Sequence, residues 1–151
     1  MPEAEVSLRI ALHYIQLGKT NEDVGLKKIS SEDSWRGTYA VEGYSQRIII
    51  HSYPGKGDVV IRKVDGKFLY VESKKGNLTK GKVSTEYTLM REAIGQLMTS
   101  EGYNDDTELA VAVPHSVKSK ELAIRWSHLP QMKSIGIRFL LVDENGKVTK
   151  I

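Results

Sequence analysis

Residues 58–74, DVVIRKVDGKFLYVESK, form the best-defined structural unit in the sequence. Two runs rich in β-branched and apolar residues, 58–64 and 68–74, lie on either side of Asp65-Gly66, which is a common turn pair. Such an arrangement predicts a β-hairpin.

The turn permits two strand registers, which differ in the side chains that share a face of the sheet. A two-residue turn puts Asp58 and Glu72 on opposite faces. A three-residue loop with Gly66 in a left-handed conformation pairs Lys63 with Lys67, and Asp58 then faces Glu72. Glycine suits both loops, so we predict the second register from the chemistry of the two carboxylates.

Hydrophobic periodicity predicts the elements on either side of the hairpin. We expect helices at 3–17, 84–100 and 118–129, strands at 36–41, 46–52, 108–114 and 137–142, and a short edge strand in the last residues. We expect loops at 51–57 and 75–83, and a polar loop with a short helical turn at 19–35. This order predicts one α/β domain over 1–151, with a central mixed β-sheet flanked by helices on both faces.

The composition limits where the protein can be located and which side chains can bind a metal ion. The chain is 40% hydrophobic and 27% charged, and no apolar run approaches the roughly 20 residues that span a membrane. The start, Met-Pro-Glu-Ala-Glu, lacks the features of a signal peptide, so we expect a cytoplasmic protein. The sequence has no cysteine and its histidines are scattered, which excludes thiolate zinc sites and favours oxygen ligands for Mg²⁺ or Mn²⁺. The net charge of +3 permits nucleic acid as a partner without requiring it.

Three polar residues interrupt the hairpin where its pattern predicts burial. Asp58 opens the first strand, and Glu72 and Lys74 close the second, so antiparallel geometry puts all three at one end. Two carboxylates in a partly buried site repel each other, and a divalent cation relieves that repulsion. Such an ion lowers the pKa of a bound water, and a lysine can orient the water or neutralise developing charge. The three side chains therefore suit hydrolysis of a phosphodiester.

Gly57-Asp58-Val59-Val60 and the triplet Glu72-Ser73-Lys74, with thirteen residues between Asp58 and Glu72, resemble the signature of the PD-(D/E)XK nuclease superfamily. That superfamily includes restriction endonucleases, archaeal Holliday-junction resolvases and RecB-type nuclease domains. The resemblance covers roughly residues 47–115 and implies a restriction-endonuclease-like fold and a Mg²⁺-dependent endonuclease acting on DNA. It also implies a homodimer or a larger nucleoprotein complex.

The resemblance assigns a role to several residues. It implies that Asp58 and Glu72 bind the metal and that Lys74 assists the nucleophilic water. An acidic residue of the first helix approaches the metal in many members, and Glu5 is the first candidate here, with Glu3 second. Two departures stand out: Gly57 replaces the proline that names the family, and the Gln-x-x-x-Tyr helix motif of some RecB-like members is incomplete, with Gln96 followed by Ser100.

Basic residues around the motif are the candidates for contacts with DNA phosphates. They lie in the loops on either side of the hairpin and on the helix that follows it: Lys56, Lys75, Lys80, Lys82 and Arg91. Lysines in such loops can also serve only to keep the surface soluble. Arg91 can instead pair with Glu86 or Glu92 on the surface.

The carboxylates have ordinary structural interpretations as well. Asp58 can cap a turn after Gly57, and Glu72 with Lys74 can be a solvent-facing pair on an edge strand. Glu5 can simply complement the dipole of its helix. Two rival functions therefore stay open: a catalytically inactive member of the fold that binds DNA or assembles a complex, and an unrelated α/β interaction domain. Binding of magnesium or manganese separates them from a nuclease.

Overall fold

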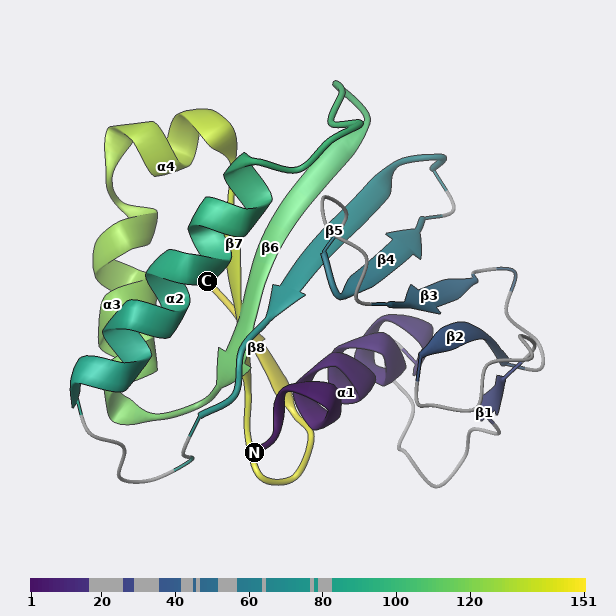
Figure 1. Cartoon of the computed structure of the whole chain (residues 1–151), viewed down its shortest axis with the longest axis horizontal. Helices are drawn as coiled ribbons and strands as arrows, with labels where there is room; N and C mark the ends of the chain where they lie inside the picture. The colour runs from purple at the N-terminus through teal and green to yellow at the C-terminus, as the bar shows by residue number, and fades with distance from the viewer. Residues whose placement is uncertain are drawn as a thin grey trace.

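The computed structural model describes residues 1–16, 26–28, 36–41, 45, 47–51, 57–63, 65–76, 78 and 83–151 (Figure 1). The helices are α1 (Glu3–Gln16), α2 (Val83–Met98), α3 (Val117–Ser127) and α4 (Pro130–Ile135). The strands are β1 (Leu26–Lys28), β2 (Gly37–Val41), β3 (Ile48–Ile50), β4 (Val59–Arg62), β5 (Phe68–Ser73), β6 (Thr107–Pro114), β7 (Arg138–Val142) and β8 (Val148–Lys150). None of the described helices is both long enough and apolar enough to cross a membrane.

The strands form one mixed, open sheet in which each strand lies beside its neighbour in the sequence, from β1 to β8. Strands β1 to β5 are paired antiparallel, β5, β6 and β7 are parallel, and β8 returns antiparallel to β7. The parallel pairs require crossover connections, which α2 supplies between β5 and β6, and α3 with α4 between β6 and β7. The expectation of an α/β fold with a mixed sheet is confirmed.

Helices cover the sheet on both faces, and each face has its own core. On the α1 side, Val6 and Ile10 of α1 pack on Ile48, Val59 and other buried residues of the strands. On the α2 side, Met90, Leu97 and Leu122 from α2 and α3 belong to a second cluster with strand residues such as Val111 and Phe139. The interior strand β6 contributes residues to both cores, because its successive side chains point to opposite faces. That double burial explains why its sequence shows no alternation.

The observed elements match the predicted ones closely, with two exceptions. Residues 26–28, predicted within a polar loop with a helical turn, form strand β1, which pairs antiparallel with β2. The helix α4 was not predicted, because its six residues are too few for a periodic pattern to emerge. The rest of the predicted loop at 19–35, and most of the loop at 51–57, lie outside the described residues.

Candidate functional site

The hairpin β4–β5 has the register in which opposite residue numbers sum to 130. Val59 pairs with Val71 and Arg62 with Phe68. The loop closes with the Lys63 N–H donating to the Lys67 carbonyl oxygen at 2.8 Å, and Gly66 has a φ of 84°. The predicted three-residue loop with a left-handed glycine is therefore confirmed.

Asp58 departs from the regular ladder at the start of β4. Its backbone N–H donates to the carbonyl oxygen of Val71 at 2.8 Å, although Val71 already faces Val59. Asp58 and Val59 thus both lie opposite Val71, which is the pattern of a β-bulge. Such a bulge changes the direction of the Asp58 side chain. The Asp58 carboxylate accepts a hydrogen bond from the backbone N–H of Ser73 at 2.9 Å. The bulge therefore fixes Asp58 against the end of β5, next to Glu72.

Gly57 is required by the geometry of this bulge. Its φ is 78°, a conformation that favours glycine. A Cβ added at this position would lie 2.8 Å from the Val71 carbonyl oxygen, the atom that holds the Asp58 N–H. Proline cannot adopt this positive φ because its ring fixes φ near −65°. The residue that names the nuclease superfamily is therefore incompatible with this chain at position 57.

Glu72 and Lys74 are buried, although their charges would suit a surface position. Their relative exposures are 6% and 5%. The Lys74 Nζ lies 3.1 Å from Oε1 of Glu72 and 3.3 Å from Oε1 of Glu92 on α2. Both residues extend to the α2 side of the sheet, since Glu72 pairs with the α2-side residue Val111. A solvent-facing pair on an edge strand does not describe this arrangement, because β5 is an interior strand covered by α2.

The two carboxyl groups hold their protons more tightly than usual. Burial raises the pKa of Asp58 to about 6, although the hydrogen bond from the Ser73 N–H opposes the shift. Burial and the nearby charge of Asp58 raise the pKa of Glu72 to about 7, against the opposing effect of Lys74. Burial alone would lower the pKa of Lys74, but the hydrogen bond and charge of Glu72 outweigh it and raise that pKa. The site therefore resists carrying two negative charges and retains its one positive charge.

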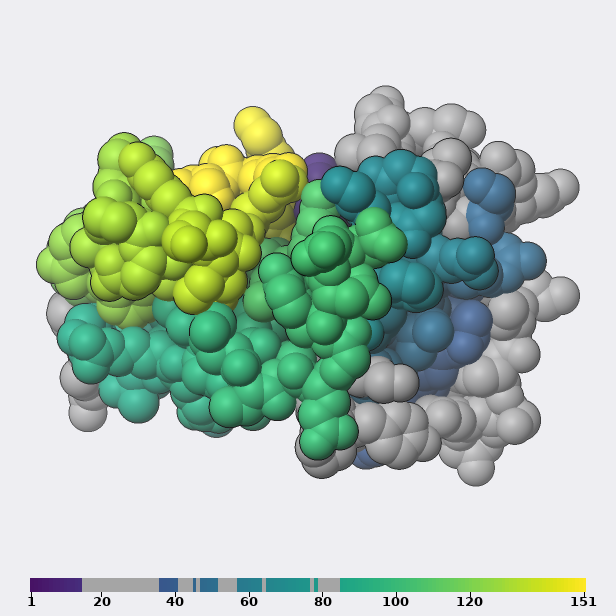
Figure 2. Space-filling view, turned by 90° about the horizontal axis from the view of Figure 1, so that it is seen from above, coloured from purple at the N-terminus to yellow at the C-terminus, as the bar shows by residue number. Residues whose placement is uncertain are grey.

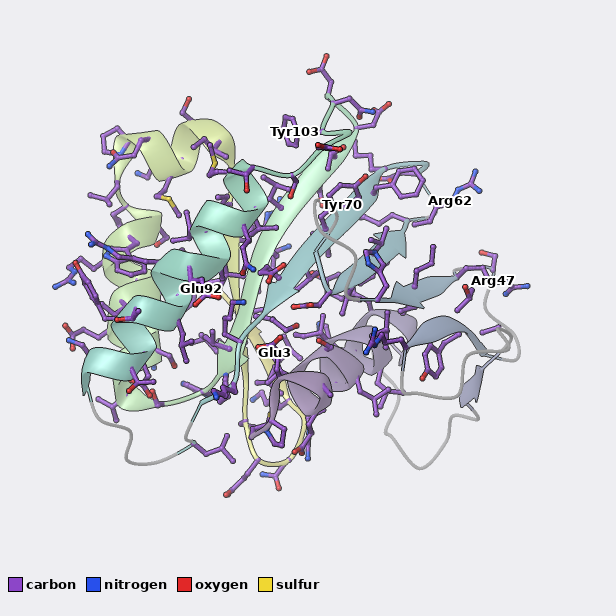
Figure 3. The ribbon with its side chains drawn as sticks, in the orientation of Figure 1. Glu3, Arg47, Arg62, Tyr70, Glu92 and Tyr103 are labelled. Carbon is purple, nitrogen blue, oxygen red and sulfur yellow. The ribbon has the colours of Figure 1, made fainter. Side chains whose placement is uncertain are left out.

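Of the two glutamates in the first turn of α1, Glu3 is the one that acts on the charged group formed by Asp58, Glu72 and Lys74. Glu5 makes an ion pair at 2.7 Å with Arg9, one turn further along α1. The charge of Glu3 contributes to the raised pKa values of Asp58, Glu72 and Lys74. Figure 3 shows Glu3 at the start of α1 and Glu92 on α2, on either side of the ends of β5 and β6.

The start of α1 is held next to the end of β5 by two backbone hydrogen bonds. The amino group of Met1 donates to the Gly76 carbonyl oxygen at 2.6 Å, and the Gly76 N–H donates to the Met1 carbonyl oxygen at 3.2 Å. Glu3 lies just after this anchor. The ligand role expected for Glu5 thus has no support in its side-chain placement, and Glu3 is the better-placed acid of α1.

The predicted phosphate-binding residues are only partly within the described structure. Lys75 is exposed and directly follows buried Lys74. Arg91 is exposed, and its guanidinium lies over the ring of Tyr87, 4.5 Å from the centroid, so it pairs with neither of the glutamates suggested by the sequence. Gln96 is exposed on α2, one turn beyond Glu92. The residues Lys56, Lys80 and Lys82 lie outside the described residues.

Glu92 is the residue of this group to which sequence reasoning gave no role in the site. Helical periodicity puts it among the exposed positions of α2, and its side chain is indeed 52% exposed. Its contact with Lys74 depends on how α2 crosses β5. No local sequence pattern encodes that crossing.

The two carboxylates of Asp58 and Glu72 suit a hard divalent cation, although they are few ligands for one ion. Among the described residues, no group of three or more histidine, aspartate or glutamate side chains is placed to hold a metal. Mg²⁺, however, commonly uses one or two carboxylates together with water and substrate phosphates. Asp58 and Glu72 supply two such carboxylates, and each is difficult to ionise without added positive charge. The residues present therefore fit an ion whose coordination shell is completed by water and by the phosphates of a substrate.

Comparisons with known proteins identify no relative. No protein-family profile, curated protein sequence or solved structure matches this chain.

Proposed function

We propose that this protein is a metal-dependent nuclease with a restriction-endonuclease-like fold, which hydrolyses phosphodiester bonds in DNA. The observation that carries the proposal is the buried ammonium of Lys74, held between Glu72 and Glu92 at the strand end where Asp58 also lies. Burying two charged groups, those of Glu72 and Lys74, is costly, and fold stability alone is better served by apolar residues of similar volume. Perturbed pKa values clustered in this way are typical of functional sites.

Asp58 and Glu72 would hold Mg²⁺ or Mn²⁺. When bound, the ion would supply a Lewis acid and would lower the pKa of a bound water. The two carboxylates would lose their protons on binding, because the added positive charge reverses the cause of their raised pKa values. The hydrogen bond from the Ser73 N–H would keep Asp58 in place as it ionises.

Lys74 would act on the reacting groups as a charged hydrogen-bond donor. Its ammonium would orient the attacking water or neutralise the charge that gathers on the phosphoryl oxygens. The water oxygen bonds to phosphorus, one P–O bond to a deoxyribose breaks, and the released oxygen takes a proton. The products are a phosphomonoester and an alcohol. Glu92 is a positioning residue in this scheme, since it holds Lys74 from the helix side.

The proposal is tested by incubating the purified protein with supercoiled, linear, branched and single-stranded DNA, with and without Mn²⁺. The variants Asp58→Asn, Glu72→Gln and Lys74→Met should each remove cleavage and still fold cooperatively. Metal-dependent cleavage that Lys74→Met leaves at the parent rate would refute the mechanism. Absence of cleavage on every substrate, with normal DNA binding, would favour the inactive member of the fold.

A further inference from the structure

Two arginines face each other at one end of the strands β3 and β4. Ile49 pairs with Val60 and Ile48 with Ile61, so the next step along the same antiparallel register puts Arg47 opposite Arg62. Both side chains are exposed. Figure 3 shows them projecting outward, away from the helices.

These arginines lie on the α2 side of the sheet, the side that also carries Glu72 and Lys74. Val60 belongs to the α2-side core, and Arg62 follows it by two residues, which returns the side chain to the same face. Ile48 and Ile50 belong to the α1-side core, so Ile49 and Arg47 point the other way.

The described helices leave this part of the face open. Helix α2 contacts β5 and β6, and α3 contacts β7. In the view from above, the helices of the α2 side and the blue strands β2 to β4 occupy different halves of the molecule (Figure 2). Ile49, in the row next to the arginines, is 40% exposed. Among the described residues, the end of the sheet at the arginine pair is therefore exposed, whereas Val60 and Tyr70 further along the same face are buried.

The charge of the arginine pair is uncompensated within the described part of the chain. Neither guanidinium has an ion-pair or hydrogen-bond partner there. Like charges directly opposite each other on neighbouring strands are destabilising. Phosphate groups bound to the two guanidinium groups offset the repulsion and accept the forked hydrogen bonds that guanidinium groups offer.

We infer that Arg47 and Arg62 form a binding site for the sugar–phosphate backbone of DNA. That this DNA is also the molecule that is cut rests on the proposed nuclease function. The backbone contact itself rests on the register, exposure and charge of the two arginines.

The test is DNA binding measured by fluorescence anisotropy without divalent metal, as a function of salt. The double variant Arg47→Gln/Arg62→Gln should weaken binding and reduce the slope of log K against log salt by about two units, one for each lost phosphate contact. The matched control is Arg125→Gln, which removes an exposed arginine from α3. It should leave affinity and slope unchanged.

Cleavage assays on the same proteins with Mn²⁺ separate this inference from the nuclease proposal. If the parent cleaves DNA and the double variant keeps the parent slope and affinity, the arginine site is refuted and the nuclease proposal stands. If binding depends on the arginines but nothing is cleaved, the arginine site stands and the nuclease proposal fails. If the parent neither binds nor cleaves DNA, both are refuted.

Discussion

The ammonium of Lys74 lies 3.3 Å from the carboxylate of Glu92, which ties the end of β5 to the middle of α2. The second carboxylate at Lys74 is that of Glu72, at 3.1 Å, on the same strand. If Glu72 is engaged by a metal, Glu92 becomes the main partner that keeps Lys74 charged and in place.

Removing the charge of Glu92 should slow the reaction without abolishing it. We expect Glu92→Gln to reduce the rate of DNA cleavage about tenfold, equivalent to about 1.4 kcal/mol of activation free energy. The apparent pKa at which the cleavage rate falls at high pH should also decrease, because Lys74 loses its proton more easily without the Glu92 charge. Glu92→Asp should restore part of the rate. The control is Glu101→Gln, an exposed glutamate beyond α2; an equal loss in that variant would argue against a positioning role.

The metal-free protein should lose stability as the pH rises from 5 to 8. The pKa values of Asp58 and Glu72 are raised from 3.8 and 4.5 to about 6 and about 7, so the folded chain holds these protons more tightly than the unfolded chain. Their stabilising contribution is complete below about pH 4 and is lost as the pH rises through the two folded-state values. Thermal unfolding in EDTA across this range measures it. The variant Asp58→Asn/Glu72→Gln should show a flatter profile, and an equally steep one would contradict the assignment.

Mn²⁺ should raise the unfolding temperature more at pH 8 than at pH 5.5. Binding an ion requires ionised carboxylates, so protons compete with the metal below about pH 7. At a free concentration of about 100 times Kd, binding adds about 2.7 kcal/mol to stability. The shift should vanish in Asp58→Ala and in Glu72→Ala. A shift that survives both substitutions would place the ion elsewhere.

Gly57→Ala should damage the site more than Gly66→Ala, although both glycines have a positive φ. Their φ values are 78° and 84°, so the conformational penalty for alanine is similar. A Cβ at 57 meets the Val71 carbonyl oxygen at 2.8 Å, whereas a Cβ at 66 meets nothing within 4 Å. We expect a loss of about 1–3 kcal/mol from backbone strain at either site. Gly57→Ala should in addition lose the metal response and cleavage, because the bulge that places Asp58 must move. Equal effects of the two substitutions in both assays would contradict this account.

The hairpin was predictable because it depends on short-range sequence, whereas its register was not decided by the turn residues. The Asp65-Gly66 pair marks the turn, and the β-branched and apolar runs on either side of it predict two strands, which the structure shows to be almost continuously buried. The choice between two registers needed a chemical argument about Asp58 and Glu72, and the observed pairing of Val59 with Val71 agrees with it. The bulge at Asp58 was not predicted, because it depends on the Val71 carbonyl and not on a local motif.

The parts of the site contributed by helices were harder to predict. From the sequence we ranked Glu5 before Glu3, although both lie in the first turn of α1, and the structure favours Glu3 because Arg9 engages Glu5. Glu92 could not be identified either, because helical periodicity assigns it to solvent. Its contact with Lys74 follows from the packing of α2 on β5, which involves residues distant in the sequence.

The strand order has a consequence for folding of the chain during its synthesis on the ribosome. Each strand pairs with the one made just before it, so the sheet can grow at one edge as the chain emerges, and no early strand must wait for a late partner. All the proposed chemical groups, from Glu3 to Glu92, are synthesised before β6. The strand β6 then adds beside β5, and the Lys74 N–H donates to its Ala112 carbonyl oxygen at 2.9 Å. The site is therefore completed only when β6 is in place.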